Sequence, residues 1–563
     1  MRPWTNRTVI LAVIGMTLLV LGVAAMFLWP VLFNHILSQE LPITPTSRVL
    51  DLWRSTGDKI PLNMEFYFFN WTNPEELKIP GKKPNLVEVG PYTFIHKTEK
   101  VNITFHPENG TVSYFVRKYW YFDPHKSNGT LNDTLVQLNV LAVAAANKVR
   151  YWDEFYQSTV SIILGQVSSI HIVKTVDEMM FTGFKDQLID LGKLAMDTED
   201  MHIPAYDRFG WFYLRNGSTF FDGHYNVATG EDDIANLGIM KKWNYTDVTD
   251  YYKSPCNVVE GSAGEFFPPG RDTDDITAFA ADLCRPMIYE YVGKATHHGI
   301  TGYKYELGEK SLGNSSFRRY PHSAAKYFER TTTTEDFFHA DYSTKKSAAG
   351  YSDPDVVDMG KCYCNGECSP VGVINITACR YGAPGFISLP HFHKADPILR
   401  EQVNGLNPNE KDHSFYYLLE PNTGVPIDVA ARLQVNILLQ PYDFVTLFRD
   451  VPKIYFPCFW FSMRAGTTED LASSLRMLLL VPSIGLYSSI IVAIVGGIVL
   501  LILAVIQYSQ KGRSHPKNSK LKRHGWVSNN DSKEKRSEHV YMDTTTTPDD
   551  NERTDRQLYP TLN

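Results

Sequence analysis

Two long apolar segments, one near each end of the chain, dominate its hydrophobic pattern. Residues 9–29 and 484–506 contain no charged side chain. A helix rises about 1.5 Å per residue, so each segment would span roughly 30 Å, the thickness of a bilayer's hydrocarbon core. We therefore predict transmembrane helices at residues 9–29 and 484–507.

A cleaved signal peptide is the alternative for the first segment, because it also begins with positive residues. Its apolar core would be shorter, and small residues would follow it, whereas residues 27–33 are large and apolar. We expect an uncleaved helix that ends at Trp29 and Pro30. Gly15, Gly22 and the pair Gly496-Gly497 would allow close helix contact, but we interpret them as ordinary transmembrane glycines.

The charges beside the two segments predict the topology. Arg2 and Arg7 precede the first segment, and six basic residues without an intervening acid follow the second: Lys511, Arg513, Lys517, Lys520, Lys522 and Arg523. The positive-inside rule places both flanks in the cytosol. We expect a cytosolic N-terminus (1–8), an ectodomain (30–483) outside the cell or in a lumen, and a cytosolic tail (508–563).

Glycosylation sequons agree with this topology. Nine of the eleven Asn-x-Ser/Thr sequons lie between the two segments, and Asn6 and Asn530 lie outside them. Because glycan transfer occurs on the lumenal side, the nine are predicted acceptors. They are Asn70, Asn102, Asn109, Asn128, Asn132, Asn216, Asn244, Asn314 and Asn375.

The region between the spans shows both strand and helix patterns. Residues 66–71 and 90–94 are short segments rich in aromatic residues, which predicts strands. Asn109-Gly110 separates residues 101–106 from residues 111–117, which predicts a β-hairpin. Residues 138–196 are helical in character, and residues 432–438 alternate as in a strand. We expect a single mixed domain with strands on both sides of a helical insertion.

One stripe in the helical insertion has the spacing of a helix face: Tyr156, Val160, Ile163, Leu164 and Val167. Such a stripe is more often a packing face than a ligand surface.

Composition and charge exclude several classes of protein. Of the 563 residues, 43% are hydrophobic and 21% charged, so the chain is neither disordered nor collagenous. The net charge of -7 gives no positive field for a phosphate backbone, so we expect no nucleic-acid partner. The sequence has no metalloprotease, nucleophile-elbow, Walker or dinucleotide motif, and we expect neither an enzyme nor a cofactor.

Seven cysteines lie between residues 256 and 458: Cys256, Cys284, Cys362, Cys364, Cys368, Cys379 and Cys458. In an oxidising compartment they should pair, but six cysteines allow fifteen connectivities, about which spacing says nothing. A zinc site at Cys362, Cys364, Cys368 and Cys379 is the alternative, although its spacing lacks the usual C-x2-C element.

Two histidine pairs could bind a metal, His297-His298 and His391-Phe392-His393. Neither has an acidic or cysteine partner at a characteristic spacing, so we expect solvent-facing or hydrogen-bonded histidines and no metal.

Eight short segments resemble the class B scavenger receptor family, in order and spacing, from the first span to the second. They are residues 69–74 (FNWTNP), 89–92 (VGPY), 139–144 (NVLAVA), 175–178 (TVDE), 267–269 (FPP), 283–286 (LCRP), 387–392 (ISLPHF) and 405–410 (GLNPNE).

The resemblance implies an α+β ectodomain, an irregular antiparallel β-barrel with a membrane-distal helical apex, held by two transmembrane helices. It also implies an apolar tunnel that conducts lipid toward the membrane and an apex formed by residues 139–184. It pairs Cys256 with Cys362, Cys284 with Cys379 and Cys364 with Cys368, and leaves Cys458 as a buried thiol. Ligand contacts are expected among Lys148, Arg150, Tyr156, Val160, Ile163, Leu164, Val167, His171 and Lys174.

The function that the resemblance implies is a scavenger receptor of the plasma membrane that also cycles through endosomes or lysosomes. Its ligands would be lipids of the fatty-acid, sterol or carotenoid class, lipoproteins or apoptotic cells. Residues 165–172 contain no Lys or Arg, which speaks against binding of anionic particles, and no cysteine beside the spans could accept palmitate. The alternatives are a two-span ligand-gated channel, disfavoured by an apolar second span, and a sorting receptor for a lumenal protein.

The cytosolic tail is polar and has almost no apolar residues to form a core, so we expect it to be disordered. Tyr559 and Leu562 near its end have the spacing of a sorting signal read by clathrin adaptors, which bind such peptides in an extended conformation.

Overall fold

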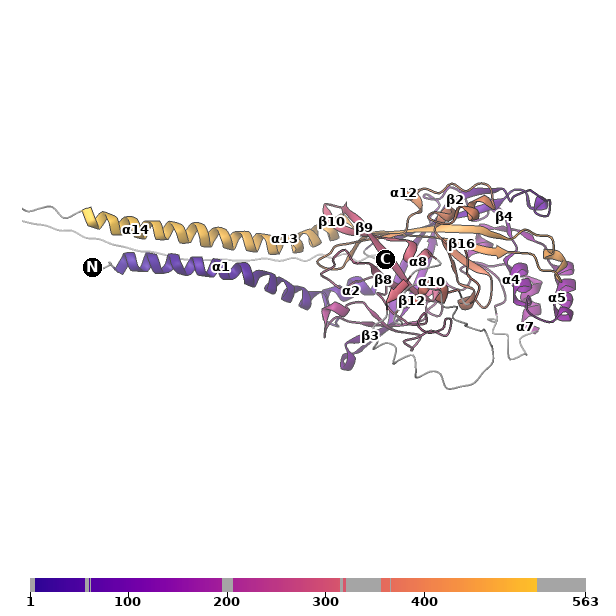
Figure 1. Cartoon of the computed structure of the whole chain (residues 1–563), viewed down its shortest axis with the longest axis horizontal. Coiled ribbons are helices and arrows are strands. Elements are labelled where there is room, and N and C mark those ends of the chain that lie inside the picture. The colour runs from indigo at the N-terminus through magenta and orange to yellow at the C-terminus, as the bar shows by residue number, and fades with distance from the viewer. Residues whose placement is uncertain are drawn as a thin grey trace, which may run out of the picture.

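A computed structural model describes residues 6–55, 60, 62–194, 206–313, 317–319, 356–364 and 366–513. Two long helical segments lie side by side and project from a body built mainly of strands (Figure 1). The helices α4, α5 and α7 lie at the end of the body farthest from them. The α+β fold with a helical apex is therefore confirmed.

An antiparallel sheet of 13 strands forms the body, in the order β7-β6-β3-β2-β1-β17-β16-β15-β10-β9-β8; β14 also pairs with β16, and β13 pairs with β14. The strands are β1 (Leu62–Trp71), β2 (Leu86–His106), β3 (Thr111–Phe122), β6 (His224–Ala228), β7 (Met240–Trp243), β8 (Ile276–Ala280), β9 (Arg285–His297), β10 (Ile300–Leu307), β13 (Val373–Asn375), β14 (Gly385–Ser388), β15 (Tyr416–Leu419), β16 (Pro426–Leu439) and β17 (Ile454–Gly466). The two-stranded sheets pair β4 (Thr134–Leu138) with β5 (His171–Thr175) and β11 (Phe317–Arg319) with β12 (Val356–Asp358).

One short segment brings the two edges of the large sheet together. Met240 of β7 donates its backbone N–H to the carbonyl of Gly261 at 2.8 Å, and Phe279 of β8 donates to the carbonyl of Ser262 at 2.8 Å. Because the same two-residue segment bonds both edge strands, the sheet is nearly closed into a barrel.

The predicted hairpin and the long C-terminal strand are confirmed. β2 and β3 pair with Phe105 opposite Val112, and Gly110 takes the left-handed conformation at a φ of 60° in the turn between them. Residues 432–438 lie inside β16, which pairs with β17 along most of its length.

Helices outside the sheet are short, apart from those near the chain ends. The apex contains α4 (Val140–Lys148), α5 (Glu154–Val167), α6 (Val176–Met180) and α7 (Gln187–Leu194). The others are α2 (Arg48–Arg54), α8 (Glu309–Leu312), α10 (Met359–Cys362), α11 (Pro397–Glu401) and α12 (Glu410–His413).

Among the described residues, two helical stretches are long and apolar enough to cross a membrane. The first is α1 (Asn6–Glu40). The second, Glu469–Gln510, comprises α13 (Glu469–Ile491), a π-helical segment (Val492–Gly496) and most of α14 (Gly497–Arg513). The expected helix end at Pro30 is wrong, because α1 continues through Pro30 to Glu40. A proline inside a helix removes one backbone hydrogen bond, a loss that packing against neighbouring helices can offset.

Most glycines of the two segments, Gly496 excepted, are points of close helix contact and not ordinary transmembrane glycines. A Cβ atom on Gly22 would lie 1.9 Å from Cβ of Ala493, and one on Gly15 would lie 2.9 Å from the carbonyl oxygen of Gly497. A Cβ on Gly485 would lie 2.1 Å from the Trp29 ring. The two helices therefore approach each other closely where these small residues remove side-chain volume.

Candidate ligand-binding apex

Helix α4 is attached to the barrel through an apolar face and a capped N-terminus. The Asn139 side chain accepts a hydrogen bond from the backbone N–H of Ala142 at 3.2 Å and donates to the carbonyl of Ser169 at 2.9 Å. Ala142, Val143 and Ala146 are fully buried against the aromatic core of the barrel. One residue thus caps α4 and also binds the segment that follows α5.

Helix α5 buries a narrow face. Gln157, Ser161 and Leu164 are its buried residues, spaced as on one side of a helix. The Ser161 hydroxyl accepts the backbone N–H of Thr446 at 2.9 Å, which joins α5 to the loop between β16 and β17.

The opposite side of α5 and the turn before it expose large apolar and aromatic side chains. Phe155 is 72% exposed and Ile162 is 64% exposed. Tyr151, Trp152 and Tyr156 are exposed beside them. We name these five residues the apex surface. Exposed apolar clusters on folded proteins are candidate surfaces for apolar partners, so this cluster is a candidate site.

The sequence stripe and the apex surface coincide only at Tyr156. Leu164 is fully buried, so its assignment as a ligand contact is wrong, and Val160, Ile163 and Val167 are half-buried. Sequence reasoning missed Tyr151, Trp152, Phe155 and Ile162. Tyr151 and Trp152 lie in the turn before α5. Phe155 and Ile162 lie seven residues apart on one face of α5, but the sequence does not show which apolar face of the helix meets the barrel.

Of the predicted basic contacts, Arg150 stacks on a residue of the apex surface, and the other three have partners or positions elsewhere. Lys174 lies on β5 with its ammonium 4.8 Å from the ring centroid of Phe184, and His171 lies 3.8 Å from a carboxylate oxygen of Glu75. Lys148, at the end of α4, lines a cavity.

Arg150 is bound to a carboxylate. Its Nη2 atom lies 3.0 and 3.1 Å from the two carboxylate oxygens of Glu367, and its guanidinium stacks 4.4 Å from the ring centroid of Tyr151. The Tyr151 hydroxyl also donates to Glu367. Burial opposes ionisation of Glu367, but hydrogen bonds from Tyr151 and Arg150 outweigh it and lower the pKa of this carboxyl.

Four of the cysteines form two disulfides, Cys256–Cys362 and Cys364–Cys368. These bonds occupy three of the four residues considered for zinc. Glu367 lies inside the loop that Cys364–Cys368 closes, so the disulfide is part of the structure that positions the partner of Arg150.

Cys284, Cys379 and Cys458 are buried thiols. Cys284 hydrogen-bonds to Cys379, which together with burial raises the pKa of the Cys284 thiol. The pairing of Cys284 with Cys379 in a third disulfide stays a prediction. Cys458 has 0% exposure, and burial raises the pKa of its thiol.

The predicted glycan acceptors differ in exposure. Asn70 and Asn375 are half-buried, and Asn314 lies outside the described residues. Exposed acceptors are Asn102, Asn109, Asn128, Asn132, Asn216 and Asn244. The sorting residues Tyr559 and Leu562 and the predicted disorder of the tail also concern residues outside the described part of the chain.

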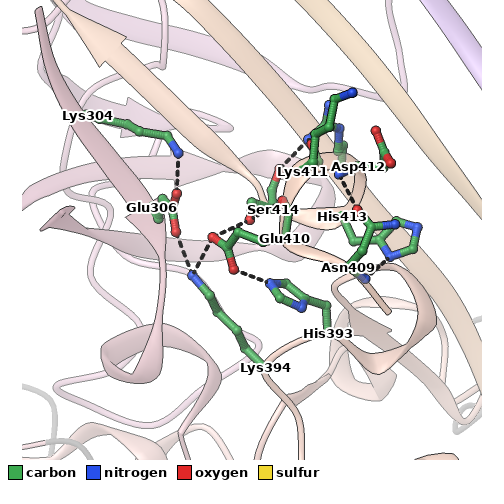
Figure 2. Close-up of polar contacts among 11 residues, drawn as sticks. Lys304, Glu306, His393, Lys394, Asn409, Glu410, Lys411, Asp412, His413 and Ser414 are labelled. Atoms are coloured by element: carbon green, nitrogen blue, oxygen red, sulfur yellow. Dashed lines mark hydrogen bonds and ion pairs between the residues drawn. The ribbon is translucent and has the colours of Figure 1, made fainter. Parts of the chain in front are cut away.

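The segment 393–414 is joined to β10 by a chain of charged residues (Figure 2). Glu306 accepts hydrogen bonds from Lys304 at 2.5 Å and from Lys394 at 2.6 Å. Lys394 also lies 3.7 Å from Glu410, which accepts a hydrogen bond from His393 at 2.9 Å (Figure 2). Because Glu306 is buried, its two ammonium partners satisfy the charge that burial would otherwise penalise.

Next to this network, His391 stacks on His413 with ring centroids 4.4 Å apart. Nδ1 of His391 accepts the backbone N–H of Asn407 at 3.0 Å, and Nδ1 of His413 accepts that of Asn409 at 3.0 Å. In both rings Nδ1 is therefore the acceptor, which leaves Nε2 as the nitrogen that can donate a hydrogen bond. The expectation of hydrogen-bonded histidines is confirmed for His391 and His393.

Glu88 lies beside the stacked histidines. Its Oε2 atom lies 2.6 Å from Nε2 of His391 and accepts the indole N–H of Trp460 at 2.7 Å. Burial first, and then the neighbouring His391, lower the pKa of His413 to about 4.

Comparison with known proteins gives consistent results. The chain is 34% identical over 506 residues to Protein peste of Drosophila melanogaster, which covers 88% of this chain and 82% of that protein. It is 28% identical over 505 residues to scavenger receptor class B member 1 of Rattus norvegicus, covering 88% of each chain. It is 26% identical over 451 residues to lysosome membrane protein 2 of Homo sapiens, covering 79% of this chain and 82% of that protein.

The sequence profile of the CD36 family matches residues 13–508, from inside the first membrane helix to the last turns of the second. With its barrel, its distal helices and its two terminal apolar helices, the chain belongs to the CD36 family of class B scavenger receptors.

Proposed function

We propose that the protein is a lipid-handling scavenger receptor that captures lipid or lipidic particles at the apex surface and passes lipid through the ectodomain to the membrane. The observation that carries the proposal is the exposure of Phe155, Ile162 and their neighbours at the end of the body opposite the membrane helices. Removing apolar area from water is worth about 25 cal/mol per Å² and needs no catalytic group.

The charge of the apex supports lipid rather than an anionic particle as the ligand. Arg150 is neutralised by Glu367, and Asp153 and Glu154 begin α5 beside the exposed aromatic residues. Aromatic side chains with one polar edge, such as Tyr151 and Trp152, are typical of surfaces that meet the boundary of a lipid phase.

Lipid uptake by cells tests this proposal. Phe155→Ser and Ile162→Ser should each reduce uptake of a fluorescent neutral lipid several-fold at equal surface expression. Ile79→Ser is the matched control, because Ile79 is an exposed isoleucine outside the apex. Uptake that is equal in all variants, or equal in cells without the protein, would contradict the proposal.

The same exposed surface would also suit a folded protein partner, which is the sorting-receptor alternative. Capture of a defined lumenal protein by the full chain, lost in Phe155→Ser while lipid uptake is retained, would favour it. The channel alternative predicts ionic current in a flux recording from the same cells, and the lipid receptor predicts none.

We further propose that the receptor cycles between the plasma membrane and endosomes or lysosomes through a clathrin adaptor bound to Tyr559 and Leu562. An antibody-feeding assay should show slower internalisation of Tyr559→Ala than of the parent. Equal rates would remove these residues from the proposal.

A further inference from the structure

A cavity of about 610 Å³ lies between the end of α4 and the loops that carry Cys284 and Cys379. Its size falls within the range of small-molecule sites, about 300–1,000 Å³. Neither the apex surface nor the charged network of Figure 2 contributes to it.

One part of the cavity wall is aromatic, and the rest is formed by small, polar and basic residues. Phe221, Trp243 and Tyr251 line it, and Phe220 and Tyr381 extend it to the surface. The Phe220 side chain is 89% exposed, which is unusual for a phenylalanine. Such a wall offers an apolar ligand both contact area and an entrance.

The polar groups of the cavity are mainly positive. Lys148 lines it, and its ammonium forms no ion pair with any residue in the described ranges. Arg380 also lines it and shares the carboxylate of Asp282, at 3.6 Å, with Arg215, at 3.0 Å. One carboxylate therefore faces two guanidinium groups, and Lys148 adds a further positive charge.

Lys148 is held beside the cavity by the fold. The Asn147 side chain donates to the carbonyl of Gly382 at 3.0 Å and accepts the Tyr442 hydroxyl at 3.1 Å, which joins the end of α4 to the cavity loop. A Cβ on Gly382 would contact the Lys148 stem at 3.6 Å, so the lysine chain runs along this glycine.

We propose that this cavity is a binding site for an amphiphile with a single anionic head, a carboxylate or a phosphate monoester, on an apolar body. The anionic head would lie between Lys148 and Arg380, whose charged side chains would donate hydrogen bonds that are stronger than those between neutral groups. The apolar body would lie against Phe221, Trp243 and Tyr251. A cationic ligand is excluded by the excess of positive charge, although aromatic walls alone would accept one.

The inference deepens the proposed function, on which it rests, by giving the chemistry of one ligand and a position for it apart from the apex surface. Its test uses the full-length protein in nanodiscs and a photoactivatable oleate that carries a diazirine. We expect labelled peptides from residues 220–223 and 377–382. Excess oleate or oleoyl lysophosphatidate should prevent labelling, and oleyl alcohol and oleylamine should not.

Substitutions at Lys148 give the quantitative arm. Lys148→Gln should reduce labelling of the cavity peptides about tenfold, the effect of losing one charge-assisted contact. Lys148→Arg should retain most of it, and Lys185→Gln, an exposed lysine of the apex region, should change nothing. Lys148 is half-buried and without an ion pair, so its replacement should leave folding intact.

Labelling confined to other peptides, or equal labelling of Lys148→Gln and the parent, would overturn the site. Labelling that occurs only in Asn244→Gln would also overturn it, because the predicted glycan at Asn244 would then occupy the cavity rim. Loss of the site with normal cellular uptake leaves the proposed function standing, whereas absence of uptake contradicts the proposed function itself. Displacement by oleate alone, or by the lysophosphatidate alone, supports the site and identifies its head group.

Discussion

The guanidinium of Arg150 and the carboxylate of Glu367 form a double hydrogen bond at 3.0 and 3.1 Å between residues 217 positions apart in the chain. The pair connects the turn between α4 and α5 to the small loop closed by Cys364–Cys368. The turn that carries Tyr151 and Trp152 of the apex surface is therefore held in place by a contact with this disulfide-closed loop.

Glu367→Gln should weaken this connection. Exposed ion pairs are worth about 0.2–1 kcal/mol, so we expect a small loss of global stability and faster amide exchange in residues 150–157. Glu231→Gln, at another exposed glutamate, is the matched control and should leave exchange there unchanged. Because the pKa of Glu367 is lowered in the folded state, its contribution is present above the ordinary glutamate pKa and is lost as the pH falls through the folded value. Unchanged exchange in Glu367→Gln would refute the connection.

His413 should make stability depend on pH. The pKa of His413 is about 4 in the folded protein and 6.5 ordinarily. Between these two pH values the unfolded chain therefore binds a proton at His413 and the folded chain does not. Stability should fall as the pH drops from about 6.5 toward 4, by on the order of 3 kcal/mol for this one group. Burial is the main cause of the low pKa of His413; His391 and His393 lower it further, and Glu88 and Asp412 oppose them.

Thermal unfolding of the full-length protein between pH 4 and pH 7 measures the effect. His413→Gln keeps an acceptor but removes the titrating group, so its midpoint should change less over this range than that of the parent. Parallel midpoint curves for the two proteins would mean that His413 does not contribute.

Gly22 should be intolerant of even one added methyl group. Gly22→Ala places a Cβ where Ala493 already lies, at 1.9 Å, so the two helices must separate. We expect a lower thermal midpoint in detergent and reduced delivery to the cell surface. Gly496→Ala is the control, because its Cβ would have an ordinary contact of 3.8 Å with Leu18. Equal behaviour of the two variants would show that the helices are not in contact at Gly22.

The disulfides can be tested by a peptide map without reduction. We expect Cys256–Cys362 and Cys364–Cys368, and in the oxidised protein also a bond between the adjacent thiols Cys284 and Cys379. Cys256→Ser opens a loop of 106 residues, worth about 4–5 kcal/mol in the chain-entropy description, and should retain the protein in the secretory pathway. Normal delivery of this variant, or a map with other pairs, would contradict the assignment.

Local patterns predicted local features well. The Asn109-Gly110 turn, the alternation in 432–438 and the apolar ends of the chain each depend on neighbouring residues, and the structure has a hairpin, a strand and long helices there. Contacts between distant segments were not predictable from one sequence. The union of β7 with β8 through residues 261–262 and the choice of buried face on α5 are set by packing against the rest of the barrel.

The passage of α1 through Pro30 has a related cause. The lost hydrogen bond predicts a helix end locally, but the neighbouring Trp29 packs against Gly485 of the second helix, a contact that the sequence pattern does not contain. The cavity beside Lys148 could likewise not be predicted from the sequence, since segments from five separate parts of the chain form it.

The central claim is that the protein binds intact lipid through its ectodomain. Mass spectrometry of lipids that co-purify with the full-length protein tests it most directly, with Phe155→Ser and Lys148→Gln purified in parallel and a two-span membrane protein of another family as reference. We predict lipid enriched over the reference, chemically unaltered and depleted in at least one of the variants. A lipid content equal to that of the reference, or recovery of hydrolysed product alone, would contradict the account.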